Sequence, residues 1–176
     1  MRKLKTFELG RKSAGEYQNS PKLPVVVILD NLRSMHNVGA VFRTSDAFLI
    51  KKVFLCGITA CPPHRQIRKS ALGAEETVEW EYFDSTKEAA EKCRAEGFHL
   101  TGIEQTDDSI GLHEFPWKKH ESVALVFGNE VDGLSPEILP LLNDALEIPM
   151  EGTKHSLNVG VTTGIVLWEC YSALRK

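Results

Sequence analysis

Three glycine-containing segments follow apolar runs and carry polar side chains that could bind a ligand. They are HNVGAVFR (36–43), GNEVDGLS (128–135) and IPMEGTKHSLNVG (148–160). The apolar runs predict strands of a parallel sheet, and ligands of such sheets bind beyond the carboxyl ends of the strands. The amide, carboxylate and guanidinium groups of these segments therefore mark the place where we expect chemistry.

None of the three segments has the spacing of a common nucleotide-binding loop. The G-x-x-x-x-G-K-[ST] phosphate loop and the G-x-G-x-x-G dinucleotide motif are both absent. The second segment has the composition of a calcium loop, but aligning Gly133 with the sixth position places Leu139 where the loop needs a glutamate. Cys56, Cys61 and His64 lack a second ligand pair at zinc-finger spacing. We therefore expect reduced thiols and no metal site.

Six short runs rich in β-branched and aromatic residues predict the strands of one sheet. Helical patterns separate these runs, which is typical of a mainly parallel sheet covered by helices on both faces. The predicted fold class is therefore α/β. The six strands are expected at residues 25–30, 52–57, 77–83, 98–102, 122–128 and 145–150.

Local signals predict where helices begin. The run STKEAAEKCRAEG (85–97) starts with a capping box and ends in glycine, which predicts a helix between the third and fourth strands. Ser135 followed by proline predicts the start of another helix. A last helix is expected at about 157–174. A helix beginning near Asn37 would place Arg43 on its second turn, with the intervening glycine and alanine leaving the near face of the helix uncrowded.

Length and composition indicate one folded domain. The chain has 176 residues, of which 42% are hydrophobic and 26% charged. The net charge is −3, so a nucleic-acid partner would have to bind a local basic patch.

The chain has neither the apolar core of a signal peptide near Met1 nor an apolar run long enough to span a bilayer. We therefore expect a cytoplasmic protein with no membrane partner.

The first 23 residues form a predicted basic N-terminal arm, followed by one domain over residues 24–176. A linker-like stretch, GEYQNSPKLP (15–24), separates the arm from the first strand. Such an arm is either a solvated tail or a contact to nucleic-acid phosphates. Its basic residues, set against only Glu8 and Glu16, are Arg2, Lys3, Lys5, Arg11, Lys12 and Lys22.

Together the three segments resemble motifs of the SpoU-type branch, or TrmH family, of the SPOUT-class RNA ribose 2′-O-methyltransferases. The first motif matches at Asn37, Gly39, Ala40 and Arg43, with TSDAF behind. The second matches at Gly128, Glu130, Gly133, Leu134 and Ser135. The third matches at Ile148 to Met150, Gly152 and Ser156 to Val159, with Glu169 beyond. The resemblance runs from about residue 24 to the end of the chain, and the motifs stand in the family's order.

The resemblance implies a trefoil knot in the C-terminal part of the chain, S-adenosylmethionine as cofactor, and a homodimer. Periodicity alone would not predict a knot, because true knots are nearly absent from other proteins. The third motif departs from the family after Val159, where Gly160-Val161-Thr162 could reshape the start of the last helix. The implied cofactor-binding residues are Thr101, Gly102, Gly128, Asn129, Gly133, Ile148, Met150, Ser156 and Leu157.

The resemblance also implies which residues act on the substrate. A ribose 2′-hydroxyl is a poor nucleophile, so its attack on a sulfonium methyl group needs in-line geometry and help in losing its proton. Arg43 would be either a general base or an electrostatic stabiliser of the developing alkoxide. Asn37 either orients the ribose or Arg43, or caps a helix. For Glu130 three roles are open: it would fix Arg43, bind the backbone of the cofactor loop, or be a solvated carboxylate in a turn. Asn158 and Ser156 would contact the substrate, unless Ser156 caps the last helix.

The predicted function is S-adenosylmethionine-dependent transfer of a methyl group to a ribose 2′-hydroxyl of tRNA or rRNA. Small size and the absence of an appended rRNA-type domain favour tRNA. The alternative is a non-catalytic RNA-binding protein on the same scaffold. Such a protein would be expected to have lost the arginine or the third motif, and this chain has both.

Overall fold

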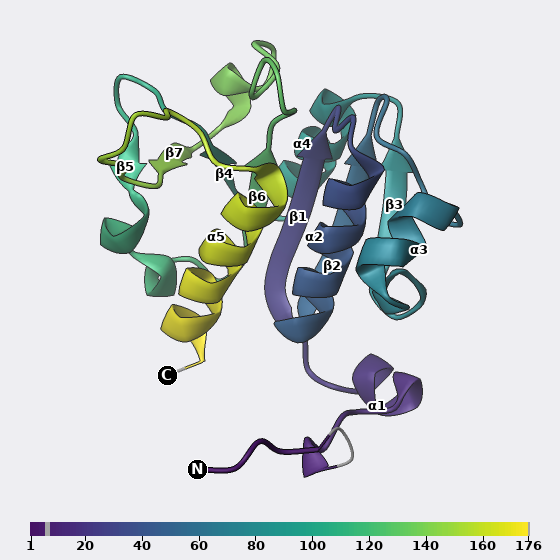
Figure 1. Ribbon diagram of the computed structural model, residues 1–176. Coiled ribbons are helices and arrows are strands. Elements are labelled where there is room, and N and C mark those ends of the chain that lie inside the picture. The colour runs from purple at the N-terminus through teal and green to yellow at the C-terminus, as the bar shows by residue number, and fades with distance from the viewer. Residues whose placement is uncertain (6–7, 176) are drawn as a thin grey trace.

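Seven strands pair side by side in the part of the chain that the structure describes, residues 1–5 and 8–175 (Figure 1). In this computed structural model every strand pair is parallel, in the order β3-β2-β1-β6-β4-β7-β5. The strands are β1 (Leu23–Asp30), β2 (Ile50–Cys56), β3 (Trp80–Phe83), β4 (His99–Ile103), β5 (Ile110–Gly111), β6 (Val123–Phe127) and β7 (Asp144–Glu147).

The expected count of six strands is therefore wrong, because β5 was missed. This strand has only two residues, Ile110 and Gly111, which pair with Leu146 and Glu147 of β7. Two residues are too few to produce the alternation that identifies a strand in a sequence. The other six strands lie where they were expected, although β3 begins later, at Trp80.

Helices cover both faces of the sheet, as predicted. The α-helices are α1 (Ala14–Gln18), α2 (Met35–Ala47), α3 (Arg65–Ala71), α4 (Thr86–Ala95) and α5 (Val159–Leu174). In Figure 1, α2 and α5 lie in front of the sheet and α4 lies behind it. None of the helices in the described ranges is long and apolar enough to cross a bilayer.

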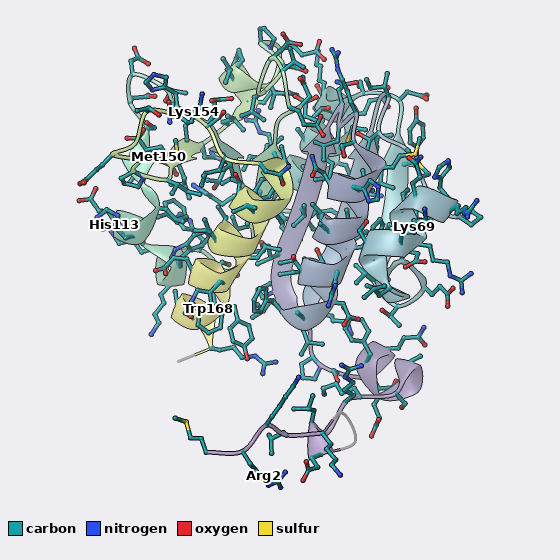
Figure 2. All side chains as sticks on the ribbon, viewed as in Figure 1. Arg2, Lys69, His113, Met150, Lys154 and Trp168 are labelled. Carbon is teal, nitrogen blue, oxygen red and sulfur yellow. The ribbon has the colours of Figure 1, made fainter. Side chains whose placement is uncertain are left out.

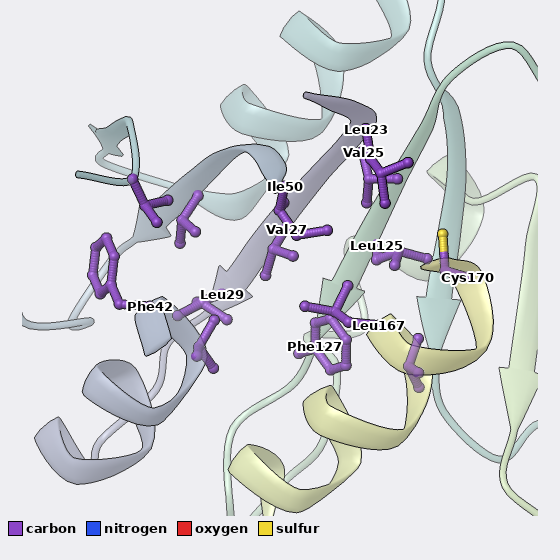
Figure 3. Close-up of a cluster of buried hydrophobic side chains, with 14 of the residues drawn as sticks. Leu23, Val25, Val27, Leu29, Phe42, Ile50, Leu125, Phe127, Leu167 and Cys170 are labelled. Atoms are coloured by element: carbon purple, nitrogen blue, oxygen red, sulfur yellow. The ribbon is translucent and has the colours of Figure 1, made fainter. Parts of the chain in front are cut away.

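The strand β1 is apolar from Leu23 to Leu29, and both of its faces are covered. Val25, Val27 and Leu29 belong to one buried cluster, which also contains side chains of α2 and α5 (Figure 3). Val26 and Ile28 belong to a second cluster with side chains of α4. Successive side chains of a strand point to opposite faces, so one continuous apolar run serves two cores.

The helix predicted from the capping box and glycine of residues 85–97 is confirmed. The helix α4 begins at its N-cap Ser85 and ends just before Gly97. The signal at Ser13 was missed: this residue caps α1, which buries Tyr17 inside the stretch expected to be a linker.

The helix predicted from Ser135 does not form, and that prediction is wrong. The Ser135 amide and hydroxyl both donate to the Asp30 carboxylate, at 2.6 and 3.0 Å, so Ser135 does not cap a helix. Pro140 cannot supply an amide to a longer helix. The chain makes only turns and the 3-10 helix η5 (Leu139–Leu141) before β7.

Part of the predicted arm packs on itself. Arg2 forms an ion pair with Glu8 at 2.6 Å, and the Lys22 ammonium lies 3.6 Å from the centre of the Tyr17 ring. Residues 6 and 7 of the arm lie outside the described residues. The division into an arm and a domain remains a prediction.

Candidate active site

A cavity of about 390 Å³ lies beyond the carboxyl ends of β4, β6 and β7. This volume falls in the range of small-molecule sites. The predicted site residues that line the cavity are Gly128, Asn129, Glu130, Gly133, Ile148, Met150, Ser156 and Leu157. The topology therefore brings the second and third motifs together around one space.

Two of the predicted cofactor residues do not line this cavity. Thr101 and Gly102 are buried within β4, and the wall begins after them, at Ile103, Glu104 and Gln105. None of these three lining residues was predicted. Their only signal was their position after a predicted strand, where sheet ligands usually bind.

The second motif forms a tight loop that depends on two glycines. Asn129 and Gly133 exchange backbone hydrogen bonds of 3.0 and 3.2 Å across it. A side chain at Gly128 would collide with the backbone of Gly133, and one at Gly133, whose φ is +69°, would collide with Glu104. The loop can close this tightly only because both positions lack a Cβ atom.

Two carboxylates, the buried Asp30 and the half-buried Glu104, hold the end of this loop. Asp30, at the end of β1, is completely buried and accepts hydrogen bonds from the Ser135 amide and from the Thr86 hydroxyl, both at 2.6 Å. Glu104 accepts from the Leu134 amide at 3.1 Å. Neither acid was predicted, because a single acidic residue after a strand is not a motif.

Glu130, at the tip of the loop, binds the start of α2. Its carboxylate accepts hydrogen bonds from the amides of Arg33 and Ser34, both at 3.0 Å, and from the Asn37 side chain at 2.8 Å. Burial opposes ionisation of Glu130, but these hydrogen bonds outweigh it and lower the pKa of the carboxyl group. Glu130 thus holds α2 in place; its contacts do not include the Arg43 side chain.

The three motifs are joined by one line of hydrogen bonds. Asn37 is buried, donates to Glu130, and accepts from the Asn158 side chain at 3.1 Å. Ser34 is the N-cap of α2, and Asn158 is the N-cap of α5. The capping alternatives for Asn37 and Ser156 are therefore wrong.

The helix α5 is regular from Val159, so the departure from the family motif at Gly160-Val161-Thr162 does not disturb its start.

Arg43 lies on the exposed side of α2 and has no hydrogen bond or ion pair within the described ranges. The helix begins at Met35, so Arg43 is on its third turn, not its second. Gly39 does not face the cavity: a side chain there would collide with Ser70 and the carbonyl of Ile67 on α3. The guanidinium is therefore available to a ligand, and the glycine serves helix packing.

The cysteines pack in the interior. Cys56, Cys93 and Cys170 are buried thiols, and burial raises the pKa of each to about 12. They are therefore protonated at neutral pH. Over residues 1–5 and 8–175, no group of three or more histidine, cysteine, aspartate or glutamate side chains is placed to hold a metal ion.

Comparison with known proteins agrees with this geometry. The profile of the SpoU rRNA Methylase family matches residues 24–168. The chain is 28% identical over 151 residues to the tRNA (guanosine(18)-2'-O)-methyltransferase of Aquifex aeolicus, covering 82% of this chain and 67% of that protein. It is 31% identical over 153 residues to the 23S rRNA (guanosine-2'-O-)-methyltransferase RlmB of Neisseria meningitidis, covering 86% of this chain but only 60% of that protein.

A solved structure is similar over the same region. The crystal structure of an AdoMet-bound rRNA methyltransferase from Sinorhizobium meliloti superposes with a TM-score of 0.80 at 27% sequence identity. The match covers 88% of this chain and 58% of that one. Because the family profile spans most of the sequence and includes all three motifs, this chain belongs to the SpoU rRNA methylase family.

Proposed function

We propose that this chain transfers a methyl group from S-adenosylmethionine to a ribose 2′-hydroxyl of tRNA or rRNA. The observation that carries the proposal is the line of hydrogen bonds from Glu130 through Asn37 to Asn158, beside the cavity. Both relatives described above are named as 2'-O-methyltransferases, one for tRNA and one for rRNA. Membership of the same family supports the same reaction here.

The cavity fits S-adenosylmethionine in size and in chemistry. Ile148, Met150 and Leu157 offer apolar surface for an adenine ring, and the glycine loop leaves backbone groups close to the space. Side chains at Gly128 or Gly133 would break the loop that forms one wall. When bound, the cofactor would supply an electrophilic methyl group on a sulfonium.

Arg43 is the proposed catalytic residue. A guanidinium keeps its proton at any physiological pH, so we assign Arg43 to stabilising the developing alkoxide and gripping an adjacent phosphate, not to base catalysis. Among residues 1–5 and 8–175 its side chain has no hydrogen-bond or ion-pair partner, which supports this role because the guanidinium remains available to the substrate. Asn37 and Glu130 act by fixing the helix that carries it.

We further propose that the C-terminal segment is knotted, as in the resembled family. Residues 155–157 line the cavity together with residues 103–105 and 128–133, and α5 then returns to pack beside α2. This path, in which the last segment passes the loops after β4 and β6 before turning back, supports a trefoil arrangement.

We also propose a homodimer. Large apolar side chains at Leu157, Val161, Ile165 and Trp168 are exposed at helical spacing on and just before α5, and Trp168 is 56% exposed. An exposed apolar stripe of this kind typically marks a protein–protein surface. Light scattering should give twice the 19.7 kDa of one chain, and Trp168→Glu should give one chain's mass. A wild-type monomer at micromolar concentration would contradict the proposal.

Two measurements on the purified protein test the function. Calorimetry should detect binding of S-adenosylmethionine, and tritiated cofactor should label in vitro transcribed tRNA or rRNA at a ribose 2′-hydroxyl. Mapping the modified nucleotide would identify the substrate. Binding of RNA without binding of the cofactor would instead favour the non-catalytic alternative.

A further inference from the structure

We propose that the exposed face of α3 binds the sugar–phosphate backbone of the RNA next to the nucleotide held by Arg43. We call Arg65, Arg68 and Lys69 the α3 face. The inference rests on the proposed function, since it names where the RNA of that reaction docks.

The charge of α3 is one-sided. Its seven residues, RQIRKSA, contain three cations and no acid. All three cations are exposed, while Ile67 and Ala71 on the opposite side of the helix are buried. Figure 2 shows Lys69 projecting at the edge of the molecule. Because the chain as a whole carries a net charge of −3, this local excess of positive charge is not a general property of the surface.

The α3 face is also placed next to the proposed catalytic residue. Gly39 of α2 packs so closely against α3 that any side chain would collide with Ser70. Arg43 lies one helical turn beyond Gly39 on α2 and about 40° farther round the helix, where its side chain is exposed next to the packed contact between α2 and α3. An RNA strand whose ribose reaches Arg43 would therefore run over α3.

The helix α4, on the opposite side of the sheet, has a different charge pattern. Its cations, Lys87, Lys92 and Arg94, are accompanied by Glu88 and Glu91 in the same helix. Lys87 pairs with Glu91 at 3.9 Å and Lys92 with Glu81 at 2.7 Å.

On α3 one of the three cations forms an ion pair in the described part of the chain, against two of three on α4. The pair that involves the α3 face, Arg68 with Glu76 at 3.5 Å, joins side chains that are 72% and 64% exposed. Arg65 and Lys69 form no ion pair within the described residues. Exposed, weakly paired cations can exchange their counterions for phosphates, which is the main source of affinity for nucleic acids.

A groove beside the α3 face adds an aromatic surface. A cavity of about 420 Å³ is lined by Pro62, Pro63, His64, Arg65, Arg68 and Trp80, and also by the acids Glu75 and Glu76, of which Glu76 pairs with Arg68. Trp80 is half-buried, so part of its ring faces the groove. Arginines next to an aromatic ring can hold a phosphate and stack an unpaired base together, which is how single-stranded RNA is commonly bound.

The test compares two variants with the same net charge. One variant, R65Q/R68Q/K69Q, removes the α3 face; the control, K87Q/K92Q/R94Q, removes three cations from α4. Binding of a fluorescein-labelled, in vitro transcribed tRNA is followed by anisotropy over a range of KCl concentrations. Calorimetry with S-adenosylmethionine checks that each variant keeps its fold and its cofactor cavity.

We expect the α3 variant to bind the tRNA at least about tenfold more weakly and to lose about 2 to 3 from its salt slope, at about 0.9 per phosphate contact. The α4 control should stay within about threefold of wild type. An additional variant, R65K/R68K, keeps the charges and should keep the salt slope. Cofactor affinity should be the same in all of them.

Two outcomes would overturn the inference: an α3 variant that binds like wild type, or an α4 control that weakens binding equally. Either result would leave the proposed function standing if the protein still binds S-adenosylmethionine and methylates RNA. A wild-type protein that binds the labelled tRNA but not the cofactor would contradict the proposed function. The inference that the α3 face binds RNA would still stand.

Discussion

Two loops form opposite walls of the cavity, and they are held very differently. Residues 128–135 are fastened by the bridge between Asn129 and Gly133, by Asp30 and Glu104 at one end, and by the contact of Glu130 with α2. Residues 148–157 contain no helix or strand. In the described part of the chain, the one hydrogen bond that ties them down runs from the Gln105 side chain to the His155 carbonyl, at 3.1 Å.

The exposure of the two walls differs in the same way. Residues 151–158 are all exposed, and Figure 2 shows Met150 and Lys154 along this open segment. The fixed wall also carries the link to the helix of Arg43, whereas the open wall supplies apolar side chains such as Met150 and Leu157. We infer that the site has one preorganised side, which aligns the catalytic helix, and one side that a bound cofactor orders.

The largest expected effect concerns Arg43, which belongs to neither wall. Arg43→Ala should lower single-turnover methylation at least about 100-fold, as loss of an oxyanion-stabilising donor does. Stability and cofactor affinity should hardly change, because the side chain is exposed and unpaired within the described residues. Arg43→Lys should restore little, since an ammonium lacks the planar fork. Near-normal methylation rates for the alanine variant would show that catalysis does not need the Arg43 side chain.

The next largest effect should come from loosening the fixed wall at its buried end. Asp30→Asn weakens the hydrogen bonds of Ser135, and we expect a loss of about 2 kcal/mol in the free energy of unfolding. Cofactor affinity measured well below the melting temperature should fall about tenfold.

The matched control is Thr86→Val, which removes the α4 contact of the same carboxylate. It should cost about 1 kcal/mol of stability but leave cofactor affinity unchanged. Equal loss of cofactor affinity in both variants would mean that Asp30 acts through global stability and not through the loop.

Hydrogen exchange should separate the two walls directly. On saturation with S-adenosylmethionine, amides of residues 150–157 should gain about tenfold protection from exchange. Few hydrogen bonds protect this wall in the free protein, so ordering by the cofactor has a large effect. Amides of residues 128–135 should change much less, being fixed already. Similar gains in both segments would contradict the distinction between a preorganised and an open wall.

The smallest effect should be the pH dependence of the link between Glu130 and α2. The pKa of Glu130 is lowered in the folded state, so its contribution to stability is present above the ordinary glutamate pKa. That contribution is lost as the pH falls through the lowered value. The difference in melting temperature between wild type and Glu130→Gln should therefore shrink below about pH 4. A difference that is constant from pH 3 to 7 would rule out ionised Glu130 as the anchor.

Much of the fold followed from the sequence because its signals are local. The β-branched run VVVILD predicts a strand covered on both faces, and Ser85 with its downstream glycine marks the bounds of α4. The three motifs identified the family and part of the cavity wall, including Gly128, Glu130 and Met150. Each of these features depends on residues that are close together in the chain, where spacing alone determines which groups can meet.

Tertiary structure decided which polar groups pair, and pairing changed the roles assigned to several residues. Ser135 looked like a helix cap, but it binds Asp30, which is 105 positions away. For Asn37 a helix cap was one of two roles left open, but its side chain connects Glu130 to Asn158 across 93 and 121 positions. A polar side chain satisfies its hydrogen bonds with whatever group the fold brings near it. Sequence spacing cannot supply that information, because the partner lies on another strand or helix whose position is set by the packing of the whole sheet.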